Sequence, residues 1–191
     1  NTAVGVSGMI DNTTGTNNVA MGFEALANNT TASANTAIGY QAGLNITTAN
    51  NATCIGHKAG LGLTTALSGS NIAIGSLSMQ GASSGVGQNV VVGYQGLTNN
   101  TSGRDNTAMG YQVMAASTTS TFNTAYGSGA LASCISGSSN TALGYRAGLL
   151  MTAGQNTAVG FSSGAGVTNG TQNTTVGANC GDSISTGDRN V

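Results

Sequence analysis

Apolar, small and polar residues follow one another in a fixed order that returns along the whole chain. Each unit opens with the pattern Asn, Thr, Ala, an aliphatic residue and Gly, as at residues 35–39, 140–144 and 156–160. Successive units begin 16 to 19 residues apart, most often 17, and we number each unit from its first residue as position zero. Such a regular repeat favours a stacked architecture over disorder.

The length of the unit predicts the fold. Helical repeats need 33 or more residues and leucine-rich repeats about 20–29, so a unit of 17 is too short for either. It suits one coil of a β-solenoid with two short strands and two turns, in which successive coils stack at the strand spacing of about 4.8 Å. The sequence therefore predicts an all-β parallel β-solenoid of about eleven coils, spanning residues 1–191 as one repetitive domain.

The opening pattern predicts the first strand of each coil. Position +1 is Thr or a β-branched aliphatic residue, and position +2 is nearly always Ala. Because side chains alternate along a strand, we expect +1 and +3 to point to one face and +2 to the other. Position +3 is always apolar, in Val4, Met21, Ile38, Ile55, Ile74, Val92, Met109, Tyr126, Leu143, Val159 and Val176.

Two further columns predict structural roles. Glycine at +4 permits a positive φ or a close backbone approach, so we expect a corner at Gly5, Gly22, Gly39, Gly56, Gly75, Gly93, Gly110, Gly127, Gly144, Gly160 and Gly177. Asparagines at position zero would stack in a hydrogen-bonded ladder, as identical polar residues do in other stacked strands. They are Asn1, Asn18, Asn35, Asn71, Asn89, Asn106, Asn123, Asn140, Asn156 and Asn173.

The residues after the corner alternate in character. Position +5 is often aromatic, position +6 mostly polar and position +7 small. This alternation predicts a second strand in which +6 faces solvent while +5 and +7 face the other way. The aromatic column is Phe23, Tyr40, Tyr94, Tyr111, Tyr145 and Phe161, with His57 in the same column. Packing between coils or chains is the favoured interpretation of this column, and a sugar-binding strip is the alternative.

A flat coil of this length leaves room mainly for small interior side chains, such as the alanines at +2 and the residues at +7. The larger +3 column would then form an apolar stripe along the rod, and such stripes are interaction surfaces. We therefore expect this column to pack against the same column of identical chains.

The composition excludes several classes of partner. The chain carries four basic and five acidic residues and a net charge of −1. It therefore has no basic stripe for nucleic acid. No apolar run is long enough to span a membrane, so no membrane insertion is expected.

The reactive residues do not form a site in the sequence. The acids fall at unrelated unit positions, whereas glycoside hydrolysis needs a pair of carboxylates. His57 is best explained as a substituted aromatic, and Cys54, Cys134 and Cys180 as small buried apolar residues. Zinc, calcium and nucleotide motifs are absent. We expect no catalytic residues, metal or cofactor, and no enzyme.

The string Asn-Thr-Ala-Ile-Gly-Tyr-Gln-Ala-Gly-Leu at residues 35–44, echoed at residues 140–149, resembles two kinds of repeat. One occurs in the heads of YadA-like trimeric adhesins, the other in the shafts of phage tail fibres. The resemblance implies a left-handed β-roll assembled as a homotrimer, extracellular on a virion or a bacterial surface. Its role there would be attachment through a cell-surface glycan or protein receptor. The chain starts and stops in the same repeat phase, so we expect a segment of a longer protein.

Three other functions remain open at this point. A self-assembling extracellular filament would use the same repeat without a tip. An ice-binding solenoid would use the partial threonine column at +1, and a polysaccharide-degrading tailspike would need a carboxylate from a neighbouring chain.

Overall fold

Each repeat unit contributes one three-residue strand, formed by positions +1 to +3. The structure is a computed structural model that describes residues 1–65, 69–83 and 85–191. The strands are β1 (Thr2–Val4), β2 (Val19–Met21), β3 (Thr36–Ile38), β4 (Thr53–Ile55), β5 (Ile72–Ile74), β6 (Val90–Val92), β7 (Thr107–Met109), β8 (Thr124–Tyr126), β9 (Thr141–Leu143), β10 (Thr157–Val159) and β11 (Thr174–Val176).

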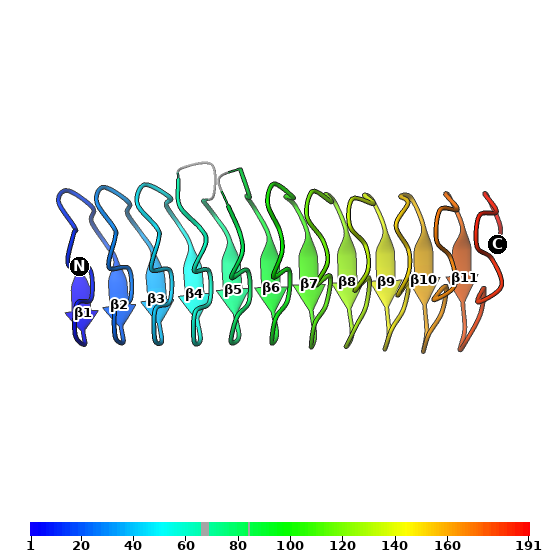
Figure 1. Ribbon diagram of the computed structural model, residues 1–191, viewed down its shortest axis with the longest axis horizontal. Helices are drawn as coiled ribbons and strands as arrows, with labels where there is room; N and C mark the ends of the chain where they lie inside the picture. The colour runs from blue at the N-terminus through cyan, green and yellow to red at the C-terminus, as the bar shows by residue number, and fades with distance from the viewer. Residues whose placement is uncertain (66–68, 84) are drawn as a thin grey trace.

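The strands form a single parallel sheet in the order β1 to β11, each paired with the next in the sequence. The register matches equivalent positions, so Ala20 lies opposite Ala37 and Met21 opposite Ile38. The result is a rod with the two ends of the chain at opposite ends of its long axis (Figure 1). The predicted all-β parallel β-solenoid with 17-residue spacing is confirmed, and no helix is found in the described ranges.

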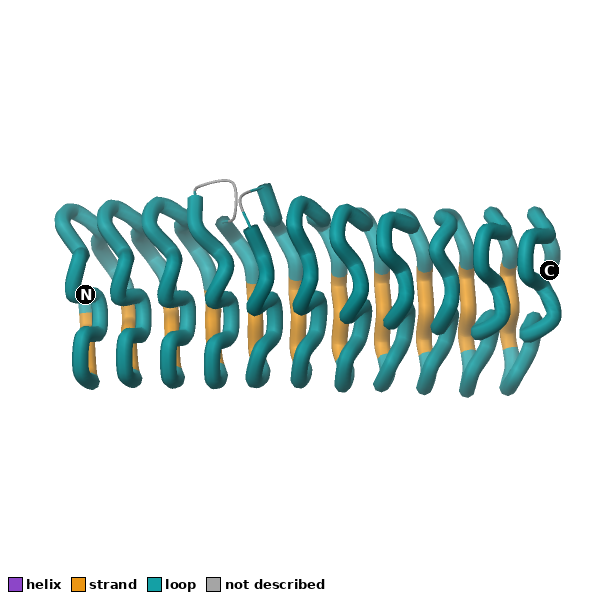
Figure 2. Tube along the Cα trace, in the orientation of Figure 1, coloured by secondary structure: helices purple, strands orange, loops and turns teal. Residues whose placement is uncertain are grey.

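The predicted second strand is wrong, because positions +5 to +8 form consecutive turns (Figure 2). In the second coil the N–H of Ala25 donates to the carbonyl of Gly22, and the N–H of Ala27 to the carbonyl of Glu24. Glu24 and Leu26 have φ of 53° and 51°, in the left-handed region. Positive φ at every second residue breaks the strict alternation of faces that a strand would impose.

The turns are nevertheless held by the neighbouring coils. The N–H of Glu24 donates to the carbonyl of Val6 in the preceding coil, at 2.9 Å. The N–H of Leu26 donates to the carbonyl of Ala42 in the following coil, at 3.1 Å. Inter-coil hydrogen bonds therefore continue outside the sheet, which meets the need of buried backbone groups for partners.

The interior is wider than the sequence indicates. The residues at +2 are fully buried from Ala20 to Ala158, as expected, but larger apolar side chains are buried beside them. In each coil from residue 18 to residue 172, one such side chain comes from either position +8 or position +11. Position +8 supplies Leu26, Met79, Leu97, Met114 and Leu131, and position +11 supplies Ile46, Leu63, Met151 and Val167.

The two positions compensate for each other. Where +11 is large, +8 is glycine, as at Gly43 before Ile46. A Cβ atom on Gly43 would lie 3.0 Å from Cδ1 of Ile46 and 3.1 Å from Cδ2 of Leu26. Where +8 is large, as at Leu26, position +11 is small or polar, as at Asn29. One shared interior volume per coil is thus filled from one side or the other.

Candidate functional site

The asparagine column forms a buried ladder along the rod. Asn123 is 1% exposed; its Oδ1 accepts the N–H of Asn140 at 2.9 Å, and its Nδ2 donates to the carbonyl of Gly137 at 3.0 Å. The N–H of the next position-zero residue donates to Oδ1 of Asn1, Asn18, Asn35, Asn71, Asn89, Asn106, Asn123, Asn140, Asn156 and Asn173. Ala52 replaces the asparagine in the fourth unit and supplies no side-chain acceptor. The ladder is therefore structural, and it provides hydrogen-bond partners for backbone groups inside the coil.

The corner glycines lie close to the backbone of the next coil. From Gly5 to Gly177 their φ lies between 123° and 145°. A Cβ atom on Gly39 would lie 2.6 Å from the carbonyl oxygen of Gly56. Both the backbone angle and the space therefore require glycine at this column.

The +3 column is an uninterrupted apolar row on the outer face of the sheet. The strand register aligns its members from Val4 to Val176, and many are exposed. Met21 is 43% exposed, Tyr126 57% and Leu143 39%, whereas the +3 residues of β4 to β7 are only partly exposed. The +1 column lies on the same outer face and contains only Thr, Val and Ile. The outer sheet face therefore carries no charge along the rod.

The +5 aromatics stack between coils and remain exposed. Phe23, Tyr40 and His57 form one continuous stack, with ring centroids 5.4 Å apart at each step. Tyr94 and Tyr111 form a second stack at 5.5 Å, and Tyr145 and Phe161 a third at 5.2 Å. Their exposed fractions, for example 53% for Tyr111, leave the ring edges in solvent. Packing between coils is therefore confirmed for these rings, and the sugar-binding strip stays a prediction.

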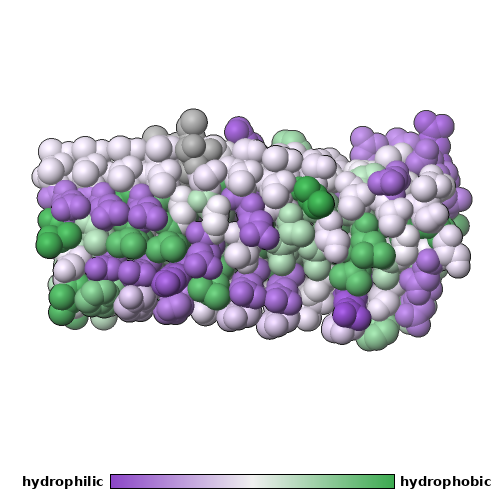
Figure 3. Space-filling view, viewed as in Figure 1, coloured by the Kyte–Doolittle hydropathy of each residue, from purple (hydrophilic) through white to green (hydrophobic). Residues whose placement is uncertain are grey.

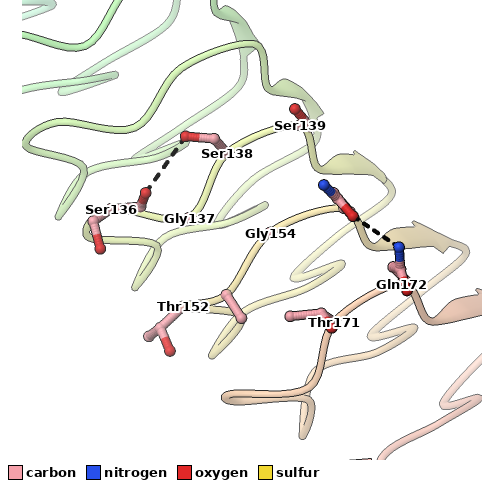
Figure 4. Close-up of a pocket in the computed structure, with 10 residues that line it drawn as sticks. Ser136, Gly137, Ser138, Ser139, Thr152, Gly154, Thr171 and Gln172 are labelled. Carbon is pink, nitrogen blue, oxygen red and sulfur yellow. Dashed lines mark hydrogen bonds between the residues drawn. The ribbon is translucent and has the colours of Figure 1, made fainter. Parts of the chain in front are cut away.

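Hollows interrupt the regular surface in several places, and one of about 360 Å³ lies beside Arg104. Another, of about 470 Å³, is bordered by residues of three successive coils, including Ser138, Gly154 and Thr171 (Figure 4). It lies at the shortest unit, which starts at Asn140 and has 16 residues. Its border is polar, and side chains of the border bond to one another: Nε2 of Gln172 donates to Oε1 of Gln155 at 3.0 Å. The missing residue opens a shallow hollow with no charged group at its border.

A smaller hollow, of about 180 Å³, lies where the aromatic column is interrupted at Ser128. Its lining includes Tyr111, Gln112, Gly129, Tyr145 and Arg146. The guanidinium carbon of Arg146 lies 5.5 Å from the ring centroid of Tyr145, a cation–π distance. This hollow of the described residues combines aromatic walls with a charged side chain.

Titratable groups do not assemble into a reactive centre in the described part of the chain. No group of three His, Cys, Asp or Glu residues there could hold a metal ion. Two hydrogen bonds from Thr171 hold the pKa of Asp188 below its usual value. The described ranges also contain no helix that is long and apolar enough to cross a membrane.

The three cysteines differ from one another. Burial raises the pKa of Cys54 to about 12 and that of Cys134 to about 11, so both thiols are inert, as expected of buried apolar residues. The expectation is wrong for Cys180, which is exposed. It occupies position +7 like the buried Ala147, but the coil that follows it contains only Asn190 and Val191.

Sequence reasoning missed a second ladder, at position +12. Oγ1 of Thr30 donates to the carbonyl of Thr47 at 3.1 Å, and Oγ1 of Thr47 to the carbonyl of Thr64 at 2.9 Å. Thr101 and Thr118 repeat this contact further along the rod. The run of Thr at equal unit positions was the available signal.

In the comparisons with known proteins, no family model matches the chain, and no curated protein and no solved structure matches it significantly.

Proposed function

We propose that this chain is a structural and adhesive segment of a fibre on a virion or a bacterial surface. In this proposal three chains of left-handed coils associate along the outer sheet face and hold an attachment region away from that surface. The setting is extracellular, and the target is a cell-surface glycan or protein.

The observation that supports the proposal most is the uninterrupted apolar row from Val4 to Val176. Soluble monomers rarely expose a large contiguous apolar patch. Covering partly exposed Val, Ile and Leu side chains contributes up to about 1 kcal/mol each, and the contribution adds along the row. Identical chains can bury this row along its whole length, because the row has the same period on every copy.

The regular rod also supports a shaft. Its eleven strands stack in register from one end of the described chain to the other, so each added unit extends the rod by one coil. On the visible face, hydrophobic and hydrophilic residues line up in short rows toward the N-terminal end and form scattered patches elsewhere (Figure 3). Only five acids are present in the chain, and no described cluster of reactive groups suggests catalysis instead.

Imaging of intact particles or cells tests this function. Gold-labelled antibodies raised against the 191-residue segment are expected to mark fibres that project from the surface. Binding of the fluorescently labelled segment to host cells is expected to saturate and to be competed by the unlabelled segment. Label confined to the cell interior would overturn the proposal. Fibres with end-to-end polymers of the segment would favour the self-assembling filament instead.

A further inference from the structure

The aromatic column is interrupted at Ser76 and at Ser128, and the two interruptions differ. At the first, the following residue at +6 is Leu77, a long side chain like its neighbours in that column. At the second, the following residue is Gly129, so the coil lacks both the ring and the long side chain. A Cβ atom placed on Gly129 would meet only Cγ of Arg146, at 3.4 Å. The hollow of about 180 Å³ lies at this second interruption.

The hollow lies where one coil lacks the aromatic ring that its neighbours have at position +5. Tyr111 stacks on Tyr94 with one face, and its other face looks toward the coil of Ser128. On the far side, Tyr145 stacks on Phe161, and the guanidinium of Arg146 lies over the Tyr145 ring. Neighbouring rings in this column are 5.2–5.5 Å apart, so the gap from Tyr111 to Tyr145 is about twice that spacing. A single ring can therefore enter beside Tyr111, where it meets the Arg146 guanidinium that lies over Tyr145.

The lining specifies the chemistry of that ring. The free face of Tyr111 offers a stacking surface. Gln112 has a donor and an acceptor at the border of the hollow, and its Nε2 is bonded to Oε1 of Gln95 at 2.9 Å. Arg146 supplies a planar cation suited to a carboxylate, and no acidic side chain is among the described residues that line the hollow.

A pyranose ring suits the gap better than a flat aromatic ring does. Its axial hydrogens make it thicker, and the coil-to-coil spacing exceeds the contact distance of two flat rings. The hollow is smaller than the roughly 300–1,000 Å³ of pockets for drug-sized ligands, so it admits one sugar residue rather than a longer ligand.

We infer that the hollow between Tyr111 and Tyr145 binds one acidic monosaccharide residue of a glycan. The sugar ring stacks on Tyr111, and its carboxylate pairs with the guanidinium of Arg146. This inference rests on the proposed function for its biological setting, since it names the class of receptor that such a fibre would touch. The binding itself belongs to the 191-residue chain and can be measured without any fibre.

The test is an NMR titration of the chain with two matched probes, methyl β-D-glucuronide and methyl β-D-glucoside. We expect the glucuronide to bind about tenfold more tightly, because only it carries the carboxylate. Arg146→Gln is expected to remove this preference. Ser128→Tyr is expected to abolish binding of both probes, because the added ring completes the stack from Tyr94 to Phe161.

A control variant separates the site from general effects. Ser76→Tyr adds a tyrosine at the other interruption, beside Leu77, and is expected to leave the glucuronide affinity unchanged. Tyr111→Leu keeps an apolar side chain but removes the stacking face, and is expected to weaken binding about tenfold or more. Melting curves of each variant establish that the chain is folded.

Equal affinity for the two probes would overturn the inference, as would glucuronide binding that survives Ser128→Tyr. The inference would also be overturned if the wild-type chain did not bind the glucuronide but a variant that prevents self-association did. An aromatic side chain of a second copy would then occupy the hollow in the wild-type assembly. Surface labelling of fibres without glucuronide binding would leave the proposed function standing and remove only the site. Glucuronide binding by a protein that is absent from the virion or cell surface would leave the site standing and overturn the proposed function.

Discussion

At the scale of single residues, the fold depends on a column of buried polar side chains. The asparagines at position zero are 0–1% exposed from Asn18 to Asn173, apart from the unit that opens with Ala52. Each links one coil to the next through its carbonyl oxygen and closes its own coil through its amide nitrogen, as Asn123 does. A buried polar group without hydrogen-bond partners costs free energy. Loss of these hydrogen bonds is therefore expected to destabilise the closed coil.

The first prediction concerns Asn123→Ala. The substitution leaves the N–H of Asn140 and the carbonyl of Gly137 without these partners inside the rod. We expect a loss of about 2–4 kcal/mol in the free energy of unfolding, measured by urea denaturation. Thr124→Val is the matched control, because Val occupies the same outward column at Val19 and Val90. It is expected to change stability by less than about 0.5 kcal/mol. Equal stability of the two variants would contradict the role of the ladder.

The second prediction concerns the thiols. Because burial raises the pKa of Cys54 to about 12 and of Cys134 to about 11, neither forms thiolate at pH 8 in the folded chain. We expect a thiol reagent to label one cysteine, Cys180, in native protein and all three in guanidinium chloride. Cys180→Ser should abolish native labelling. Rapid labelling of two or three sites in native protein would contradict the packing described here.

At the scale of the coil, the two sources of the interior side chain explain how so variable a repeat keeps one shape. Large residues at +8 stack on one another in Leu97, Met114 and Leu131, whereas Ile46 and Leu63 fill the same volume from +11. Either choice leaves φ at position +8 in the left-handed region, at 51° for Leu26 and 58° for Gly43. Successive coils therefore keep a large apolar side chain in the interior, although the unit position that supplies it varies.

This compensation gives the third prediction. Ile46→Ala empties the interior of its coil and is expected to cost about 2–5 kcal/mol. Gly43→Leu in the same chain adds a side chain of the kind that Leu26 places at +8 with φ of 51°, close to the 58° of Gly43. The double variant is expected to recover about half of the loss or more, measured by urea denaturation. A double variant less stable than Ile46→Ala would show that the two positions do not share one volume.

The corner gives the fourth prediction. Gly39→Ala combines a φ of 131° with a Cβ atom 2.6 Å from the carbonyl oxygen of Gly56. We expect a loss of about 3 kcal/mol or more. At Gly85, φ is 106° but no described atom would lie within 4 Å of the Cβ atom. Gly85→Ala therefore tests the backbone angle alone, and its cost is expected to be about 1–2 kcal/mol. Thermal melts of the two variants that coincide would contradict the close approach at the corner.

The sequence predicts the coil better than it predicts the turns. The strand, its register and the buried +2 column follow from strict recurrence, because in-register stacking places equal unit positions together. The second strand does not exist, because the sign of φ at Glu24 and Leu26 is not fixed by residue type. Glutamate and leucine adopt the left-handed region here only because neighbouring coils hold their backbone.

The surface hollows show the same limit. Ser128 and Gly129 are ordinary residues for a turn, and their small size leaves a hollow because tyrosines lie on either side. Likewise, the exposure of the aromatic column could not be decided from its period, since rings that pack on one another can keep their edges in water. Sequence recurrence therefore predicts which residues lie above one another, but not which of them are covered.

At the scale of the whole molecule, the rod presents an uncharged sheet face from β1 to β11 with the apolar row along it. A charge in this row would have to lose its water if identical chains cover it, which costs several kcal/mol. Tyr126 and Phe122 allow a matched comparison, because they are 57% and 62% exposed but only Tyr126 belongs to the row. Tyr126→Glu is therefore expected to dissociate the assembly, whereas Phe122→Glu is expected to leave it intact.

Sedimentation equilibrium of the purified 191-residue chain tests the association of identical chains most directly. The expected species is a trimer, with three times the 18.5 kDa of one chain, which Tyr126→Glu converts to monomer and Phe122→Glu does not. A wild-type chain that sediments as an 18.5 kDa monomer at all concentrations, with its apolar row in water, would contradict the account.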